Sequence, residues 1–387
     1  MIQHNATGDP AAEYPAADAS PTYVKAIAPY QGGRPIEEIA RAYGLAPDRI
    51  VKLASNENPL GMPDSAREAM TKAISQLGRY PDGNGFDLKQ ALAARHSVPA
   101  DWLTLGNGSN DILELAARAL CSAGESIVYS QYSFAVYALA TQSLGAKAIV
   151  VPARDLGHDL DAMVRAVRDD TRLVFVANPN NPTGTYLSGD ALERFFDSIP
   201  SRVAIVLDEA YTEYLEPQLR YDAIQWVRRF PNLIVSRTFS KAYGLAGLRV
   251  GFAVAQPPIT DLLNRIRQPF NVNSLAQAAA IAALGDEAFL EKSRVLNRAG
   301  IAQLQAGFER LELRYVPSYG NFVLVEVGDA AAVNEAMLRA GVIVRPVANY
   351  GLPTWLRITV GLAHENEAVL KVLGQALTPT APLKGAV

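Results

Sequence analysis

The stretch SRTFSKAYGLAGLRVG at residues 236–251 is the most informative part of this sequence. It places Lys241 between an apolar run typical of a buried strand and a glycine-rich segment. Hydroxyl side chains precede the lysine at Thr238 and Ser240, and Arg249 follows it. Hydroxyl and guanidinium groups are donors that bind anionic oxygens. The stretch therefore predicts a lysine that faces an anionic partner.

The chemistry open to Lys241 in such a setting is narrow. An amine in a partly desolvated site loses some of its preference for the charged form, so it can attack an aldehyde and form a Schiff base. Pyridoxal phosphate (PLP) is an aldehyde that also carries a phosphate, for which Thr238, Ser240 and Arg249 are suitable donors. The alternative is a structural lysine at a strand end that forms a surface ion pair.

Length and charge leave room for a large enzyme and argue against some partners. The chain has 387 residues, enough for two or three domains, or for one large domain and a smaller one. Its formal net charge of -3 argues against a nucleic-acid or membrane-surface binder, because those partners require a strongly basic field. Any anion must then be bound by local arginines.

Cysteine, histidine and the termini predict a cytoplasmic chain without a metal site. The single cysteine, Cys121, cannot form an intramolecular disulfide and is expected in the core. The four histidines form no pair with the spacing of metal ligands. No run approaches the ~20 apolar residues of a membrane span, and residues 1–20 lack the features of a secretory signal.

Short apolar runs alternate with helical patterns through the middle of the chain. Continuous apolar runs of this length are typical of strands buried on both faces. They lie at residues 126–129, 148–151, 173–177, 203–207, 233–235 and 250–254, with helical periodicity between them at 160–167 and 189–196. This alternation predicts an α/β fold with a helix-covered, mostly parallel sheet.

Beyond residue 270 the pattern changes. A long alanine-rich helical region at 274–311 is followed by strands and helices in mixed order, at 322–326, 331–340, 342–345 and 356–360. Mixed order predicts a smaller α+β domain. We therefore expect a mobile extension at 1–25, a large domain at 50–270, and a small domain composed of 26–49 and 271–387.

Polar residues collect directly after the predicted strands, where ligands bind in parallel sheets. Asn181 lies in a turn-forming string at 178–184, which could also be only a loop. Asp208 and Tyr211 follow the run at 203–207. A buried carboxylate is costly without a cationic partner, and a protonated pyridine nitrogen would be one. The alternative for Asp208 is an N-cap of the next helix, with Tyr211 packed against it.

A phosphate cradle is suggested upstream, in LGNGSNDIL at residues 105–113. Two glycines let the backbone approach a ligand, and the helix that opens at Ser109 and Asn110 offers free N–H groups to a phosphate. An ordinary Ser or Asn N-cap explains the same string, which matches no nucleotide-binding motif. Each string has a structural explanation when taken singly, but their ordered occurrence after strand-like runs favours one common site.

Over nearly its whole length after about residue 25, the chain resembles the fold-type-I PLP-dependent aminotransferases. Strings specific enough to narrow the resemblance to the histidinol-phosphate aminotransferase group are APY at 28–30, KLASNENPLG at 52–61, RYPD at 79–82 and LRITVG at 356–361. The resemblance implies PLP as the cofactor. It also implies transfer of an amino group between glutamate and 2-oxoglutarate on one side and histidinol phosphate and imidazole acetol phosphate on the other, in histidine biosynthesis.

The resemblance implies a role for individual residues. Lys241 forms the Schiff base and then moves the substrate Cα proton, while Asp208 holds the pyridine nitrogen. Asn181 and Tyr211 bind the ring hydroxyl. Arg357 binds the substrate α-carboxylate, although strand alternation alone also fits an exposed surface arginine. The other implied ligands are Tyr132 on the ring, Ser109, Asn110, Thr238, Ser240 and Arg249 on the phosphate, and Arg345, Tyr30 and Asn58 at the substrate.

Tyr80 resembles a residue that completes the phosphate site of a partner subunit, so the resemblance implies an obligate homodimer.

Three other functions remain open. The first is an aromatic amino acid aminotransferase. Side chains that could line a pocket for an aromatic substrate are Tyr30, Tyr132, Phe134 and Tyr350, and the string QYSF at 131–134 departs from the PTY string common in the group. A PLP decarboxylase of a phosphorylated amino acid would use the same cofactor residues. A non-catalytic PLP-binding regulator would carry a DNA-binding appendage, for which this acidic chain has no spare length.

Overall fold

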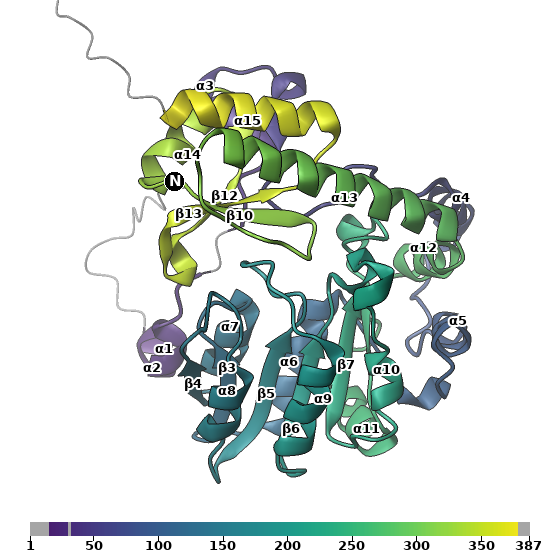
Figure 1. Cartoon of the computed structure of the whole chain (residues 1–387). Coiled ribbons are helices and arrows are strands. Elements are labelled where there is room, and N and C mark those ends of the chain that lie inside the picture. Colours follow the sequence, from purple (N-terminus) through teal and green to yellow (C-terminus); the bar gives the residue numbers. More distant parts are fainter. Residues whose placement is uncertain (1–14, 30–31, 378–387) are drawn as a thin grey trace, which may run out of the picture.

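A seven-stranded sheet forms the centre of the computed structural model, which describes residues 15–29 and 32–377 (Figure 1). The strand order is β2-β8-β7-β6-β5-β3-β4. β8 runs antiparallel to β7 and β2, whereas the pairs formed by β3, β4, β5, β6 and β7 are parallel. The prediction of a mostly parallel sheet is therefore confirmed. The strands are β2 (Leu103–Gly106), β3 (Ser126–Ser130), β4 (Lys147–Val151), β5 (Thr171–Ala177), β6 (Ala204–Asp208), β7 (Leu233–Thr238) and β8 (Gly251–Val254).

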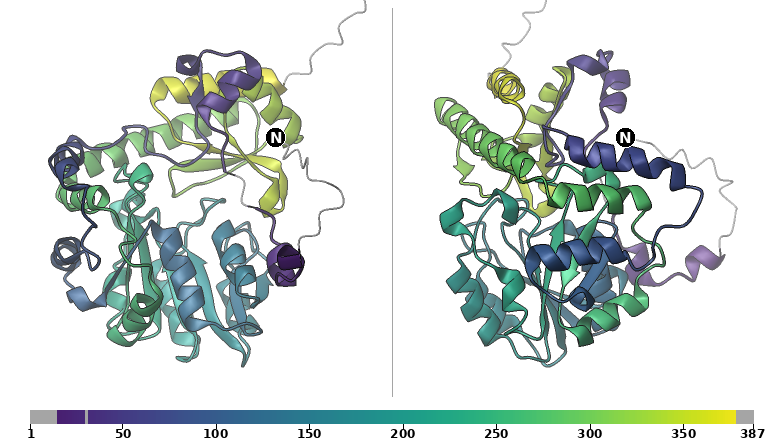
Figure 2. Two further views of the ribbon diagram at one scale, coloured as in Figure 1. Left: turned by 180° about the vertical axis from the view of Figure 1, so that it is seen from behind. Right: turned by 90° about the vertical axis from the view of Figure 1, so that its right-hand side faces the viewer.

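Helices cover both faces of this sheet (Figure 2). Successive residues of β5 enter different clusters: Val174 packs with α8, α9 and α10, whereas Phe175 packs with α6, α7 and α11. Because both faces are buried, the strands are continuous apolar runs instead of alternating ones. The helices are α6 (Ser109–Leu120), α7 (Ala135–Ser143), α8 (Leu160–Ala166), α9 (Gly189–Ser198), α10 (Ala223–Trp226) and α11 (Pro257–Ile266).

A second, smaller unit lies over the carboxyl ends of the parallel strands (Figure 1). Its antiparallel sheet has the order β12-β13-β10-β9, and Leu304, Met337 and Val369 pack three helices onto it. Its elements are α13 (Glu287–Arg310), β9 (Tyr315–Val316), β10 (Phe322–Glu326), α14 (Ala330–Arg339), β12 (Arg345–Val347), β13 (Leu352–Thr359) and α15 (Ala363–Leu377).

The N-terminal part of the chain contacts both units. α3 (Ile36–Tyr43) packs Ile39 into the small unit beside Leu338, and β1 (Val51–Lys52) pairs in parallel with β11 (Val342–Ile343). Within the extension predicted to be mobile, residues 15–25 form α1 (Pro15–Asp18) and α2 (Thr22–Lys25). α2 lies against α7, where Gln142 Nε2 donates to the carbonyl oxygen of Tyr23 at 3.4 Å. The rest of that predicted extension, 1–14, lies outside the described residues.

The alanine-rich region at 274–311 is two helices, α12 (Ser274–Leu284) and α13, and Asp286 caps the second by accepting from the Phe289 amide. α12 shares the core of the large unit with α4 (Asp64–Ala73) and α5 (Phe86–His96). We therefore propose that the domain boundary falls near residue 285 instead of residue 271.

The predicted strand at 342–345 is divided between two sheets. Val342 and Ile343 pair with β1, whereas Arg345 pairs with Arg357 of β13. This division turns the chain so that Arg345 lies beside Arg357, facing the large unit. The run at 250–254 is a strand as predicted, but it is the antiparallel one.

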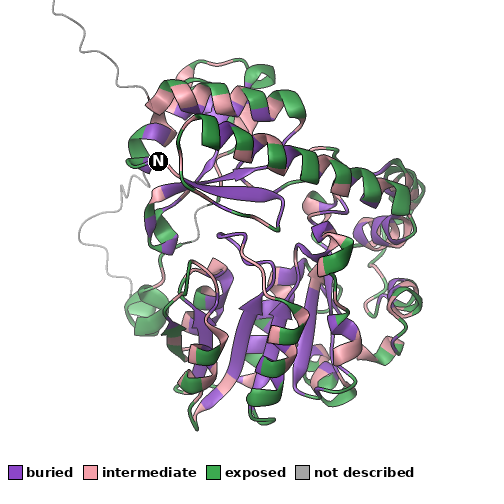
Figure 3. Cartoon of the chain, in the orientation of Figure 1, coloured by how far each residue is buried: buried purple, intermediate pink, exposed green. Residues whose placement is uncertain are grey.

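Burial follows this architecture (Figure 3). The strands of both sheets are mostly buried, and the helices expose their outer faces. Cys121 is buried and free, as expected. Within the described part of the chain, no helix has both the length and the apolarity needed to cross a membrane. The cytoplasmic location stays a prediction.

Candidate active site

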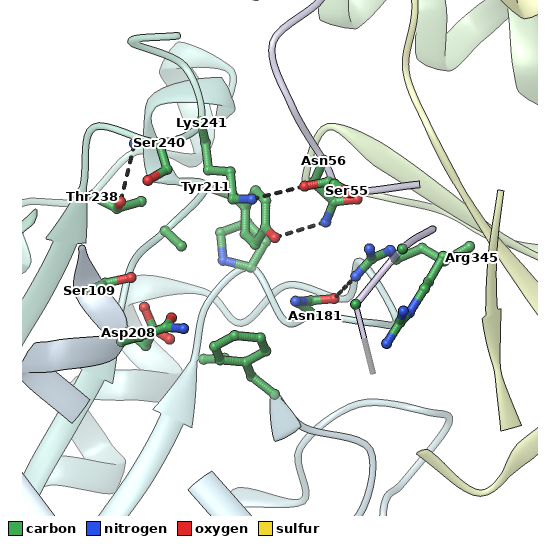
Figure 4. A pocket seen from close by; sticks show the side chains of 18 of the residues that line it. Ser55, Asn56, Ser109, Asn181, Asp208, Tyr211, Thr238, Ser240, Lys241 and Arg345 are labelled. Carbon is green, nitrogen blue, oxygen red and sulfur yellow. Dashed lines mark hydrogen bonds between the residues drawn. The ribbon is translucent and has the colours of Figure 1, made fainter. Parts of the chain in front are cut away.

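A pocket of about 360 Å³ lies where β5, β6 and β7 end beneath the small unit's sheet (Figure 4). Small-molecule sites usually enclose ~300–1,000 Å³, so this cavity can hold a cofactor-sized ligand. The large unit contributes most of the lining, and β12 and β13 add two arginines from above. The sequence-predicted residues that line it are Ser109, Asn110, Asn181, Asp208, Tyr211, Thr238, Ser240, Lys241, Arg249, Arg345 and Arg357.

Lys241 extends from the loop after β7 into this pocket (Figure 4). Its Nζ donates a hydrogen bond to the Ser55 carbonyl oxygen at 3.3 Å and lies 5.8 Å from the centre of the Tyr211 ring. Burial, followed by the positive charge of Arg357, lowers the pKa of the amine to about 7. A substantial fraction of the amine is therefore uncharged and nucleophilic at neutral pH.

Asp208 is the last residue of β6, and its carboxyl group faces the pocket. Oδ2 accepts a hydrogen bond of 2.9 Å from the Tyr137 hydroxyl, while Oδ1 is buried and has no hydrogen-bond partner among the described residues. Burial raises the pKa of this carboxyl group to about 6, against the opposing effect of the Tyr137 bond. A buried acceptor of this kind is costly unless a ligand supplies a donor, and a cationic N–H is the most favourable one.

Hydrogen bonds join the sides of the pocket. Asn56 Nδ2 donates to the Tyr211 hydroxyl at 2.9 Å, and Arg357 Nη1 donates to Asn181 Oδ1 at 2.6 Å. Arg357 Nη2 also donates to the Ala54 carbonyl oxygen at 2.8 Å. Burial raises the pKa of Tyr211 to about 12, so its hydroxyl remains protonated. These contacts connect the small unit, through Arg357, to groups suited to bind a phenolic oxygen.

The residues predicted to form an anion cradle at the start of α6 lie together at the pocket. Gly108, with φ of 78°, leads into the helix, whose first residues Ser109 and Asn110 line the pocket. Arg249 Nη1 donates to Ser240 Oγ at 3.2 Å. A β-carbon at Gly108 would lie 2.5 Å from Arg249 Nη2, so only glycine leaves room for the guanidinium. Free amides at a helix N-terminus, hydroxyl groups and an arginine together suit a phosphate.

The structure does not bring Tyr132 into the pocket. Its ring packs instead against the cluster that contains Val347 and Tyr350, and its carbonyl oxygen accepts from Asn180 Nδ2 at 2.6 Å. Phe134 lines the pocket in its place. Both residues belong to the loop between β3 and α7, and local sequence could not show which of them faces the cavity.

Asn58 is also placed differently from the prediction. Its amide donates to the Ala242 carbonyl oxygen at 3.0 Å and to Ser293 Oγ at 2.9 Å, so it anchors the Lys241 loop to α13 and does not line the pocket. Asn56, two residues earlier in the same NENPLG string, is the pocket residue that sequence reasoning missed. A second missed residue, Tyr137, lies behind Asp208 and carries no motif of its own.

Tyr80 lies apart from this lining. The side chain of Tyr80 is 83% exposed and stacks on Phe270 at 4.8 Å, away from the pocket of its own chain. Tyr30 falls outside the described residues.

The fold and the site define an α/β enzyme in which a lysine amine, a buried carboxylate and an anion cradle surround one cavity. The model for the family "Aminotransferase class I and II" matches residues 48–377. The chain belongs to this aminotransferase family.

Individual relatives narrow the comparison. Histidinol-phosphate aminotransferase 1 of Cupriavidus pinatubonensis is 67% identical over 92% of this chain and 96% of that protein. Histidinol-phosphate aminotransferase 2 of Ralstonia nicotianae is 66% identical over the same shares. The crystal structure of histidinol-phosphate aminotransferase from Sinorhizobium meliloti in complex with pyridoxal-5'-phosphate has a TM-score of 0.85 at 29% identity, over 92% of this chain and 96% of that one. The predicted resemblance to this group is confirmed.

Proposed function

We propose that this chain is a PLP-dependent aminotransferase that exchanges an amino group between glutamate and histidinol phosphate, with 2-oxoglutarate and imidazole acetol phosphate as the corresponding oxo compounds. The observation that carries the proposal is the placement of Lys241 and Asp208 in one cavity, below Arg345 and Arg357, with Asp208 Oδ1 unpaired among the described residues. The histidinol-phosphate aminotransferases that this chain resembles support the choice of substrate.

The residues present fit PLP. Asp208 Oδ1 suits the ring nitrogen, and Asn181 and Tyr211 suit the ring hydroxyl. Phe134 is our candidate for stacking on the ring. The phosphate fits the cradle formed by Ser109, Asn110, Thr238, Ser240 and Arg249. When bound, PLP supplies an aldehyde and an electron-accepting ring.

The chain's own groups then perform binding and proton transfer. Lys241, with its lowered pKa, attaches the cofactor and afterwards serves as the general base that takes the proton from the substrate Cα. Arg357 binds the α-carboxylate of glutamate through a charge-assisted bond. Hydrogen bonds to Asn181 Oδ1 and to the Ala54 carbonyl oxygen hold the Arg357 guanidinium at the pocket.

Arg345 is our candidate for the second anionic group of the substrate. Arg345 and Arg357 are direct partners across β12 and β13, and their side chains are buried, with 8% and 7% exposed. Glutamate carries two carboxylates, and histidinol phosphate carries one phosphate and no carboxylate. A pair of adjacent arginines suits both, because each anion finds at least one guanidinium.

Kinetic selectivity tests the substrate. We expect kcat/KM for histidinol phosphate to exceed that for phenylalanine and tyrosine at least tenfold. A phosphate carries up to two negative charges and three acceptor oxygens, so it can accept from both arginines, whereas phenylalanine and tyrosine offer only a singly charged carboxylate. Higher kcat/KM for phenylalanine would favour the aromatic aminotransferase instead. Release of carbon dioxide from a phosphorylated amino acid would favour a decarboxylase.

Lys241→Ala tests the aminotransferase assignment itself. This variant should bind PLP without a covalent link and show almost no turnover with glutamate and imidazole acetol phosphate. Normal rates would overturn the assignment.

We also propose an obligate homodimer in which Tyr80 contributes to the partner's phosphate site. Support comes from the exposed aromatic pair of Tyr80 and Phe270, which is 83% and 44% exposed in the single chain. Exposed aromatic pairs are typical of interfaces.

A further inference from the structure

Tyr137 on α7 contacts the acid of the site from behind. The residue is fully buried, and its hydroxyl donates to Asp208 Oδ2 at 2.9 Å. Its ring stacks on Phe175 of β5, with centroids 4.6 Å apart and an interplanar angle of 2°. The ring of Phe134 lies at 6.1 Å, perpendicular to it. Tyr137 is thus held by the sheet on one side and contacts two pocket-lining residues on the other.

We propose that Tyr137 is a positioning residue for transamination, which holds Asp208 Oδ2 so that Oδ1 remains ionised and directed at the ring nitrogen of bound PLP. This inference rests on the proposed function. Tyr137 does not line the pocket, so its effect on the site would be exerted through Asp208.

The geometry explains why one hydroxyl group matters here. A carboxylate can rotate about its Cβ–Cγ bond, and a short bond at Oδ2 from a ring fixed by stacking restricts that rotation. Without the hydroxyl, both oxygens of Asp208 would be buried without a side-chain donor in the described residues, which favours the neutral acid. A neutral acid does not hold a protonated ring nitrogen by charge.

The other charged or titratable groups around Asp208 do not replace this bond. Burial and the neighbouring charge of Glu209 raise the pKa of Asp208, whereas the backbone amide of Ala210 and, from across the pocket, Lys241 lower it by smaller amounts than the Tyr137 bond does. Lys241 is itself partly uncharged near neutral pH and is consumed when the cofactor attaches. The Tyr211 hydroxyl is engaged by Asn56. The bond from Tyr137 is the largest of the effects that favour the ionised form of Asp208.

The Tyr137→Phe variant tests the inference through two measurements. Titration of the apoprotein with PLP at pH 6, 7 and 8.5 gives the affinity for the cofactor. The absorbance of the bound cofactor, followed against pH, gives the midpoint pH of its change. We expect PLP affinity to fall about tenfold at pH 6 to 7, the size of a hydrogen bond to a charged group, and to recover in part at pH 8.5, where Asp208 ionises again. The midpoint pH of the absorbance change should also shift relative to the wild-type protein.

Tyr129→Phe is the matched control. Tyr129 is 6% exposed and its ring centroid lies 6.5 Å from that of Tyr137, so the same atom is removed from the same cluster without touching Asp208. This variant should keep the affinity and its pH dependence. Equal losses in the two variants, or a loss in Tyr137→Phe that does not vary with pH, would mean a merely structural role and overturn the inference.

Two further measurements keep the inference testable. In an Asp208→Asn background, Tyr137→Phe should cause little additional loss, and independent losses would contradict the proposal. If Tyr137→Phe does not fold, fluorotyrosine at position 137, a stronger hydrogen-bond donor of nearly equal size, should shift the pH dependence in the opposite direction, and no shift overturns the idea. Failure of the wild-type protein to bind PLP would contradict the proposed function itself, a different result from wild-type binding with an unaffected variant.

Discussion

At the scale of single residues, Lys241 combines a position that sequence indicates with a pKa that only the folded site creates. Its flanking hydroxyls and Arg249 are visible in the sequence, whereas the burial of the amine and the nearby charge of Arg357, which lower its pKa, arise only in the folded structure. The same contrast separates Asp208 from Tyr137. A carboxylate after an apolar run can be found by pattern, but the tyrosine that bonds it is 71 residues away along the chain.

The lowered pKa of Lys241 predicts a pH dependence of cofactor attachment. The amine has an ordinary pKa of 10.5 when unfolded and about 7 in the folded site, so it is mostly uncharged above pH 7. We expect the rate of covalent PLP attachment to rise about tenfold between pH 6 and pH 8 and then level off. Borohydride trapping with peptide mass spectrometry measures this rate and locates the lysine.

The same shift has a consequence for stability, whose sign follows from linkage. A lysine with a lowered pKa destabilises the folded apoprotein at low pH, and this cost decreases as pH rises from about 7 towards 10.5. Lys241→Ala removes the cost, so it should stabilise the apoprotein more at pH 6 than at pH 10.

The borohydride-trapping experiment also provides the outcome that would contradict the lowered pKa. A rate of covalent PLP attachment that rises only above pH 9 would show that the site does not lower the pKa of Lys241.

The sequence could identify most of the site because its ligands follow strands in chain order. Lys241, Asp208, Asn181 and Arg249 each occupy a strand end or the loop after it, and the parallel sheet brings those ends to one edge. Asn56 could not be distinguished from Asn58 in this way. The two share one string, and which amide enters the pocket depends on the left-handed backbone at Asn56, with φ of 54°.

At the scale of elements, the turn before α6 controls the anion cradle. Gly108→Ala should weaken PLP binding at least tenfold, because the new β-carbon displaces Arg249 as well as straining a backbone with φ of 78°. Gly124→Ala is the control, since Gly124 has φ of 84° but no atom within 4 Å of a β-carbon. Fluorescence titration of both apoproteins with PLP separates loss of the cradle from backbone strain. Equal affinities would contradict the role of Gly108.

A buried ion pair links β7 to the residue that follows β6, outside the lining of the pocket. Glu209, adjacent to Asp208, accepts from Arg237 at 2.8 and 2.9 Å, and the two side chains are 0% and 13% exposed. Glu209→Gln should lower the free energy of unfolding by ~3–5 kcal/mol, because the buried Arg237 loses the carboxylate that accepts its hydrogen bonds. Urea unfolding measures this loss.

The control for this pair lies on the surface. Glu193 pairs with Arg229 at 2.6 Å, with side chains 33% and 55% exposed, so Glu193→Gln should cost ~0–1 kcal/mol. Similar losses of unfolding free energy in the two variants would contradict a larger contribution from the buried charge pair.

Strands and helices were predicted correctly where the hydrophobic periodicity of the sequence is strong. The direction of a strand and the sheet it joins were missed where they depend on which strands pair. The runs from 126 to 235 are strands as expected, because each is apolar and lies between helices. The direction of β8 and the split of 342–345 depend on which strand each segment meets, and Pro346, just after the split, coincides with a register shift in the β12–β13 pair. The hydrophobic pattern of the sequence does not show which strands pair with each other.

At the scale of the whole molecule, the proposed dimer can be tested by exchange of subunits. If Tyr80 binds the partner's phosphate, Tyr80→Phe should remain dimeric by light scattering, since the ring is kept, yet lose about tenfold in PLP affinity with the hydroxyl. Tyr80→Ala should also weaken the dimer, because the stack on Phe270 is removed. A monomeric wild-type protein that binds PLP fully would rule the arrangement out.

Mixing two impaired variants at a limiting PLP concentration identifies the chain whose site Tyr80 completes. A heterodimer of Lys241→Ala with Tyr80→Phe has one site with both substitutions and one with neither if Tyr80 acts across the interface. Such a heterodimer should regain about half of the wild-type activity, from its one intact site. If Tyr80 acts within its own chain, both sites carry a substitution, and activity should not exceed that of one Tyr80→Phe site. The exposed position of Tyr80, away from the pocket of its own chain, favours the first outcome.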